Sequence, residues 1–101
     1  MNDPQLVIKA LEQLAKDLKE APTPAERASL YSAARWLLSD LEAFINEDLN
    51  EDGYLLEAVG KALWAFGAMA GYDVNNNLSQ SEHCVAALAA IGNISSVLNR
   101  S

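Results

Sequence analysis

Cysteine and histidine are almost missing from this chain, whose 101 residues include one of each, Cys84 and His83. A single cysteine cannot form an intrachain disulfide, which fits a reducing compartment. The two residues are too few ligands to complete a zinc site within the chain. As neighbours on a helix they point about 100° apart, so they do not form a catalytic pair. We expect an exposed His83 beside a buried Cys84.

Basic residues are also scarce, with 7 Lys and Arg against 14 Asp and Glu and a net charge of −7. This balance disfavours nucleic-acid binding and anionic membrane surfaces, because both need clusters of cations. The glycines are isolated, so no phosphate-binding loop is present, and no other catalytic motif occurs. The sequence therefore predicts a non-enzymatic protein that needs no cofactor.

Targeting and membrane signals are weak as well. The first residues lack the charged start and unbroken apolar run of a signal peptide, and we expect a cytoplasmic protein. The most apolar stretch, from Tyr54 to Tyr72, contains Glu57 and Lys61 at i, i+4 spacing. That spacing suits a water-facing ion pair, so no membrane span is expected.

What the chain has in abundance is helical periodicity, with no strand pattern competing. It predicts an all-α single domain over residues 1–101, folded as an antiparallel four-helix bundle with short connections. The helices are expected at about 4–20, 24–47, 54–70 and 80–98. Asp3 is a predicted N-cap, and capping boxes begin at Thr23 and Ser79.

The expected core follows the apolar stripe of each helix. The first two helices are ordinarily amphipathic, and the last two are apolar around most of their circumference. The stripe of the third helix is predicted to be Leu56, Val59, Leu63 and Phe66. That of the fourth is predicted to be Val85, Leu88, Ile91 and Leu98, widened by Ala87 and Ile94. Two helices of this kind need more cover than two others give, so we expect one of them to face another chain, most simply in a homodimer.

Glycine inside helices supports that expectation. Gly60 and Gly67 are seven residues apart and share one face of the third helix. Each costs about 1 kcal/mol relative to alanine, which suggests that another helix packs very close there. Tryptophan is a frequent interface anchor. The candidate partner or dimer interface therefore comprises Trp36, Gly60, Trp64 and Gly67.

The stretch DLNEDGYL, which starts at Asp48, resembles an EF-hand calcium loop. The resemblance implies side-chain ligands from Asp48, Asn50 and Asp52 and the backbone carbonyl of Tyr54. It fails at the twelfth position, where the family places a bidentate Glu and this chain has Val59. The alternative is a turn between two helices, in which Asp52 or Asn50 caps the third helix.

Acidic residues gather around this stretch, with seven between Asp40 and Glu57 and no Lys or Arg among them. Such a run is either solvated or a contact surface for a basic partner. The candidate partner-binding residues in it are Glu47, Asp48, Glu51 and Asp52.

The leading functional hypothesis is an acidic helical interaction module that binds and inhibits or regulates a protein partner. An inhibitor, an antiactivator of a transcription factor and an immunity-type protein all fit, the partner being a basic protein or a transcription factor. One alternative is a calcium-responsive module using the loop at residues 48–59. Another is a structural homo-oligomer subunit.

Overall fold

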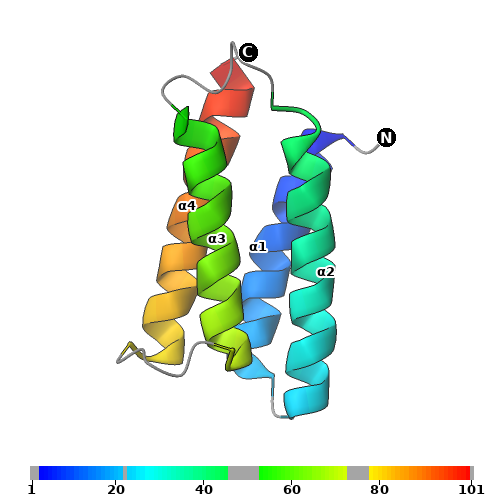
Figure 1. Ribbon diagram of the computed structural model, residues 1–101, viewed down its shortest axis with the longest axis vertical. Coiled ribbons are helices and arrows are strands. Elements are labelled where there is room, and N and C mark those ends of the chain that lie inside the picture. The colour runs from blue at the N-terminus through cyan, green and yellow to red at the C-terminus, as the bar shows by residue number, and fades with distance from the viewer. Residues whose placement is uncertain (1–2, 22, 46–52, 73–77, 101) are drawn as a thin grey trace.

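The computed structural model of the protein describes residues 3–21, 23–45, 53–72 and 78–100. These residues form four helices and contain no strand, so the chain is all-α as expected (Figure 1). The helices are α1 (Pro4–Glu20), α2 (Pro24–Glu42), α3 (Tyr54–Ala70) and α4 (Gln80–Arg100).

The four helices lie side by side, and each runs opposite to the one before it (Figure 1). α3 packs most extensively against α4 and also packs against α2. α1 lies against α2 and α4 and touches α3, while the described parts of α2 and α4 do not meet. α3 therefore touches all three other helices, and its remaining side is uncovered.

Side-chain caps fix the starts of the first two helices, as predicted. Asp3 Oδ1 accepts a hydrogen bond of 2.9 Å from the backbone N–H of Gln5 at the start of α1. Thr23 Oγ1 accepts one of 3.2 Å from the backbone N–H of Glu26 at the start of α2. Each cap satisfies one of the backbone donors that a helix leaves free at its N-terminus.

The other two helices start in different ways. The capping box of α4 is complete: Ser79 Oγ accepts from the Glu82 N–H at 3.2 Å, and Glu82 Oε1 accepts from the Ser79 N–H at 3.3 Å. α3 follows Gly53, which occupies the N-cap position with a left-handed φ of 74°, and no described side chain caps the helix. Asp52 and Asn50, the candidate caps for this helix, lie outside the described residues.

α2 ends at Glu42, five residues before the predicted end at residue 47. The next backbone bonds are of the tighter i to i−3 kind, from the Ala43 N–H to the Asp40 carbonyl at 3.2 Å and from the Phe44 N–H to the Leu41 carbonyl at 3.0 Å. The last turn contains acids and no basic residue. Acids are unfavourable there because the C-terminal end of a helix carries partial negative charge.

The core differs from the predicted stripes on α3 and α4. α3 buries Leu55 completely and leaves Leu56 48% exposed, while Val85 on α4 is 66% exposed. Alanines share the buried faces with larger residues: Ala58, Ala62 and Ala65 on α3, and Ala87 and Ala90 on α4. Both helices are apolar on several sides, so periodicity alone does not decide which side turns inward.

Neighbouring leucines test this orientation of α3. Leu55→Ala should lower the free energy of unfolding by about 2–5 kcal/mol, because it leaves a cavity in the core. Leu56→Ala, the matched control, should change it by about 0.5 kcal/mol or less. Urea denaturation followed by circular dichroism measures both. A larger loss for Leu56→Ala than for Leu55→Ala would show that α3 is rotated from the orientation described.

Candidate functional site

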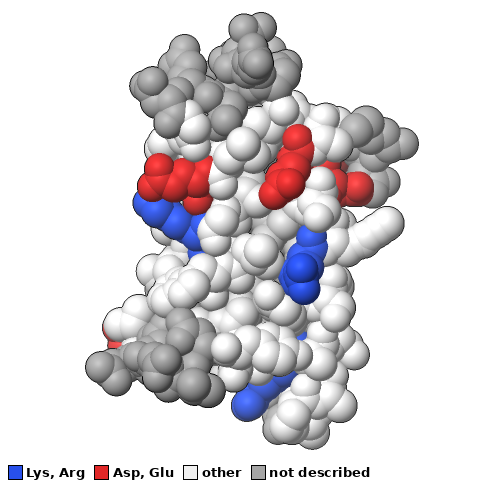
Figure 2. Space-filling model, in the orientation of Figure 1, with Lys and Arg blue, Asp and Glu red and all other residues white. Residues whose placement is uncertain are grey.

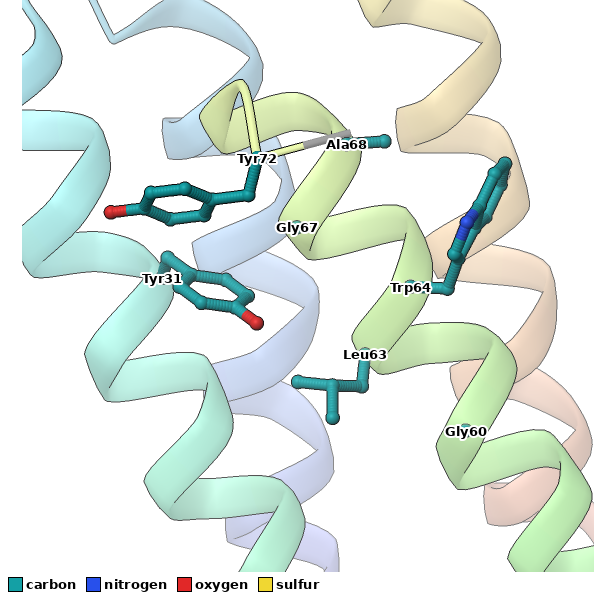
Figure 3. Close-up of a pocket in the computed structure, with 7 residues that line it drawn as sticks. All are labelled: Tyr31, Gly60, Leu63, Trp64, Gly67, Ala68 and Tyr72. Carbon is teal, nitrogen blue, oxygen red and sulfur yellow. The ribbon is translucent and has the colours of Figure 1, made fainter. Parts of the chain in front are cut away.

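An apolar groove lies between α2 and α3 (Figure 3). It has a volume of about 300 Å³, at the lower end of the range for ligand pockets. We call it the aromatic groove. Its lining residues are Tyr31, Gly60, Leu63, Trp64, Gly67, Ala68 and Tyr72.

The end of α3 builds one wall of the aromatic groove. Gly71 has a left-handed φ of 94°, which reverses the chain direction after the helix. The backbone N–H of Tyr72 then donates to the Gly67 carbonyl at 2.9 Å. This reversal brings the Tyr72 ring onto Tyr31 of α2, with ring centroids 5.0 Å apart and planes tilted by 53° (Figure 3). The two tyrosines thus join α2 to the end of α3.

The two glycines of α3 lie along the aromatic groove. A Cβ on Gly67 would lie 3.6 Å from Cε1 of Tyr31, an ordinary contact, and one on Gly60 would meet nothing within 4 Å. The expected close packing of another helix on this face does not occur within the described chain. Gly67 is buried against the Tyr31 side chain of α2 at an ordinary contact distance, whereas Gly60 is exposed.

Trp64 forms the opposite wall and is 49% exposed. Its ring meets the ring of His83 on α4 edge-on, with centroids 5.4 Å apart and planes at 72°. His83 is only 3% exposed, so its predicted exposure is wrong: the first turn of α4 packs against α3 beneath Trp64. Within the described chain, Nδ1 of His83 has no hydrogen-bond partner. Trp64 is therefore supported on one side and open to solvent on the other.

No lining residue of the aromatic groove carries a charge. Lys61 and Glu57 form the expected exposed i, i+4 pair on α3, with Nζ and Oε1 3.1 Å apart. Arg35 of α2 lies one turn beyond Tyr31, with its guanidinium carbon 5.8 Å from the centroid of that ring. The face seen in Figure 2 is mostly uncharged, with a few scattered charged residues.

Three of the four predicted interface residues, Gly60, Trp64 and Gly67, meet in the aromatic groove. Trp36 does not. It follows the buried Ala34 by two residues, so it points about 200° around the axis of α2, away from the core, and it is 58% exposed. Sequence reasoning missed Tyr31 and Tyr72. The signal for Tyr72 was its place directly after Gly71, where a helix-ending glycine turns the chain back.

The other predicted sites are not built by the described residues. The acidic partner-binding residues and three calcium candidates lie outside them: Glu47, Asp48, Asn50, Glu51 and Asp52. The fourth calcium candidate, Tyr54, is the first residue of α3. No group of three or more His, Cys, Asp or Glu side chains in the described ranges could hold a metal ion.

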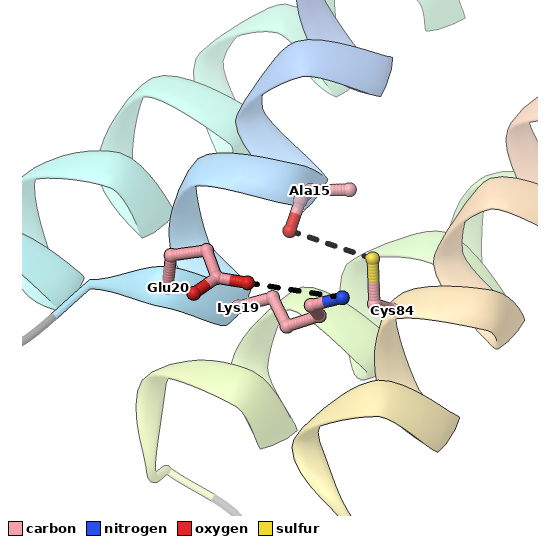
Figure 4. Close-up of polar contacts among 4 residues, drawn as sticks. All are labelled: Ala15, Lys19, Glu20 and Cys84. Atoms are coloured by element: carbon pink, nitrogen blue, oxygen red, sulfur yellow. Dashed lines mark hydrogen bonds and ion pairs between the residues drawn. The ribbon is translucent and has the colours of Figure 1, made fainter.

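Cys84 is buried, as expected, and its thiol faces α1. Its Sγ lies 3.6 Å from the Ala15 carbonyl oxygen, near the ion pair of Lys19 and Glu20 at 3.8 Å (Figure 4). The contact ties the first turns of α4 to α1. A buried thiol held in this way has a packing role rather than that of an accessible nucleophile.

Within the described residues, one helical segment, Gln80–Asn99 of α4, is long and apolar enough to cross a membrane by length and composition. The same criterion is met by core helices of soluble proteins, so it is weak evidence for a span. It is a different segment from Tyr54 to Tyr72, the stretch in which the sequence argued against a span.

Comparison with protein-family models, with curated proteins and with solved structures found no match to this chain.

The glycines provide a test of the groove that is independent of any partner. Gly60→Ala and Gly67→Ala should each raise the free energy of unfolding by about 1 kcal/mol, because alanine favours helix and neither Cβ meets a clash. Gly92→Ala on α4 is the matched control, since it also meets nothing within 4 Å and should give the same gain. Thermal and urea denaturation measure all three. A loss of stability at Gly60 or Gly67 would contradict the open groove described.

Proposed function

We propose that this protein is a non-enzymatic interaction module whose aromatic groove binds an apolar helical segment of a partner protein. The observation that carries the proposal is the half-exposed Trp64 at the edge of an uncharged hollow. Trp and Tyr are the commonest anchors of protein interfaces. Tyr72, which is 61% exposed at the other wall, adds a second anchor.

The glycine face gives independent support. Gly60 and Gly67 weaken α3 by about 1 kcal/mol each relative to alanine, and packing within the chain does not require them. Small residues at two-turn spacing let a second helix approach closely. Gly67 is buried beneath Tyr31, so a partner helix lying along α3 would place its backbone over the exposed Gly60 and its side chains against Trp64.

Such binding would regulate the partner by covering its functional surface. An inhibitor, an antiactivator of a transcription factor or an immunity-type protein would act in this way in the cytoplasm. The net charge of −7 would speed encounter with a basic partner through long-range attraction. The acidic segment with Glu47, Asp48, Glu51 and Asp52 stays a prediction for a second contact.

A homodimer is the second candidate, in which two antiparallel bundles pair through their α3 faces. The uncharged lining of the aromatic groove favours it, since two acidic chains repel least where they meet without charge. Sedimentation equilibrium at micromolar concentration should then give twice the monomer mass. A large closed ring would instead indicate the structural homo-oligomer subunit.

The calcium-responsive module remains an alternative for the loop that contains Asp48, Asn50 and Asp52. Calcium that binds only the folded state raises the melting temperature by mass action. A melting temperature that does not change in millimolar calcium would exclude this alternative.

The two exposed tryptophans give a matched test of the groove. Trp64→Ala should weaken partner binding by about 2 kcal/mol or more, roughly 30-fold. Trp36→Ala, which removes an equally large exposed ring outside the groove, should leave the affinity unchanged. Wild type and both variants serve as baits for affinity capture from a lysate of the source cell, with the captured proteins identified by mass spectrometry.

Circular dichroism must first show that all three baits are folded, because Trp64→Ala also removes the ring contact with His83. A partner held by wild type and Trp36→Ala but lost by Trp64→Ala is the expected result. A partner captured equally by all three baits would place the binding surface elsewhere. Sedimentation equilibrium of the same three proteins tests the dimer. If two copies pair through the groove, wild type and Trp36→Ala should have the dimer mass and Trp64→Ala the monomer mass.

A further inference from the structure

A second hollow lies next to the aromatic groove on the α2 side. It has a volume of about 380 Å³ and is lined by Tyr31, Ser32, Arg35 and Tyr72. Tyr31 and Tyr72 line both hollows, so the tyrosine pair is a shared wall between an uncharged site and a cationic one. A single ligand segment that crosses this wall would meet an apolar surface first and a guanidinium next.

Arg35 is a cation whose position is set by an aromatic ring. Its guanidinium carbon lies 5.8 Å from the centroid of the Tyr31 ring, within the range of a cation–π interaction. Among the residues that the structure describes, Arg35 forms no ion pair with a carboxylate, whereas Lys19 and Lys61 each have one. The tyrosine ring orients the guanidinium without neutralising it, which leaves its N–H donors available.

We propose that the helical segment bound in the aromatic groove carries one carboxylate about one turn from its apolar anchor, and that Arg35 binds this carboxylate. The inference rests on the function proposed above and names the chemistry of the partner. Arg35 follows Tyr31 by four residues, a rise of about 6 Å along α2, which matches the spacing of residues i and i+4 on a partner helix. A guanidinium binds a carboxylate with two parallel hydrogen bonds, so the contact fixes the register of the partner.

The charge of the whole chain limits the partner to one such acid. With a net charge of −7, the chain repels a strongly acidic segment, and the exposed Glu57 lies one turn from Gly60 at the edge of the groove. The favoured partner is therefore neutral or basic overall, with a single Asp or Glu near its apolar anchor. The aromatic groove supplies affinity, and Arg35 selects among apolar helices.

Matched peptides test this selection. The probes are N-acetylated, alanine-based helical peptides with lysines for solubility, which carry Trp and Glu four residues apart in either order. Control peptides have Gln in place of Glu. Each is titrated into the isotope-labelled protein at low salt, and binding is followed by the amide shifts of Gly67 and Tyr72.

One of the two Glu peptides should bind about two- to fivefold more tightly than its Gln control, the range expected for a partly exposed ion pair. The net charge of −7 favours the more cationic Gln peptide, so a preference for Glu can arise only locally. Arg35→Gln should remove the preference. Lys61→Gln, which removes a different cation next to the groove, should keep it.

Equal binding of the Glu and Gln peptides, with shifts at Gly67 and Tyr72, would overturn the role of Arg35 and leave the groove as a binding surface. A preference for Glu that survives in Arg35→Gln would also overturn it. Absence of binding by all the peptides would overturn the inference, and capture with the Trp64→Ala bait separately decides the proposed function. Indole-3-propionate binding as tightly as the Glu peptide would identify a small carboxylate, rather than a helix, as the occupant.

Discussion

The contact between α3 and α4 is the constraint on which the rest of the structure depends. Alanines at positions 58, 62 and 65 of α3 and at 87 and 90 of α4 are buried, and α3 packs more extensively against α4 than against any other helix. Small side chains permit a short distance between helix axes. Because the alanines take the inward face of α3, Gly60 and Trp64 are left exposed on its outer side, while Tyr31 of α2 covers Gly67.

That outer side carries a groove whose lining residues have no charge, on an acidic protein. Tyr72 reaches it only because Gly71 ends α3 in a left-handed conformation, and Tyr31 meets it from α2. The groove is thus assembled from two helices and a helix-ending turn, all held by the core. A site built on helices in this way is more rigid than one carried by a loop, which suits the recognition of a regular partner helix.

His83 shows how the packing of α3 against α4 also supports Trp64 in the aromatic groove. Its ring is buried against Trp64, and its Nδ1 has no hydrogen-bond partner in the described parts of the chain. The edge-on contact, with ring centroids 5.4 Å apart, packs the indole of Trp64 against α4. It holds the indole of Trp64 in one place, with one side of the ring exposed at the edge of the groove.

Sequence by itself determined the helical class, three of the four helix spans to within two residues, and the caps at Asp3, Thr23 and Ser79, because these depend on local periodicity and on hydrogen bonds between near neighbours. It also selected Gly60, Trp64 and Gly67 as interface candidates. Only the tertiary structure decided that Leu55 rather than Leu56 is buried, that Val85 is exposed and that His83 is covered. The physical reason is that a helix that is apolar on most sides can bury a similar apolar surface after rotation about its own axis. Only the shapes of the neighbouring helices select one of these rotations.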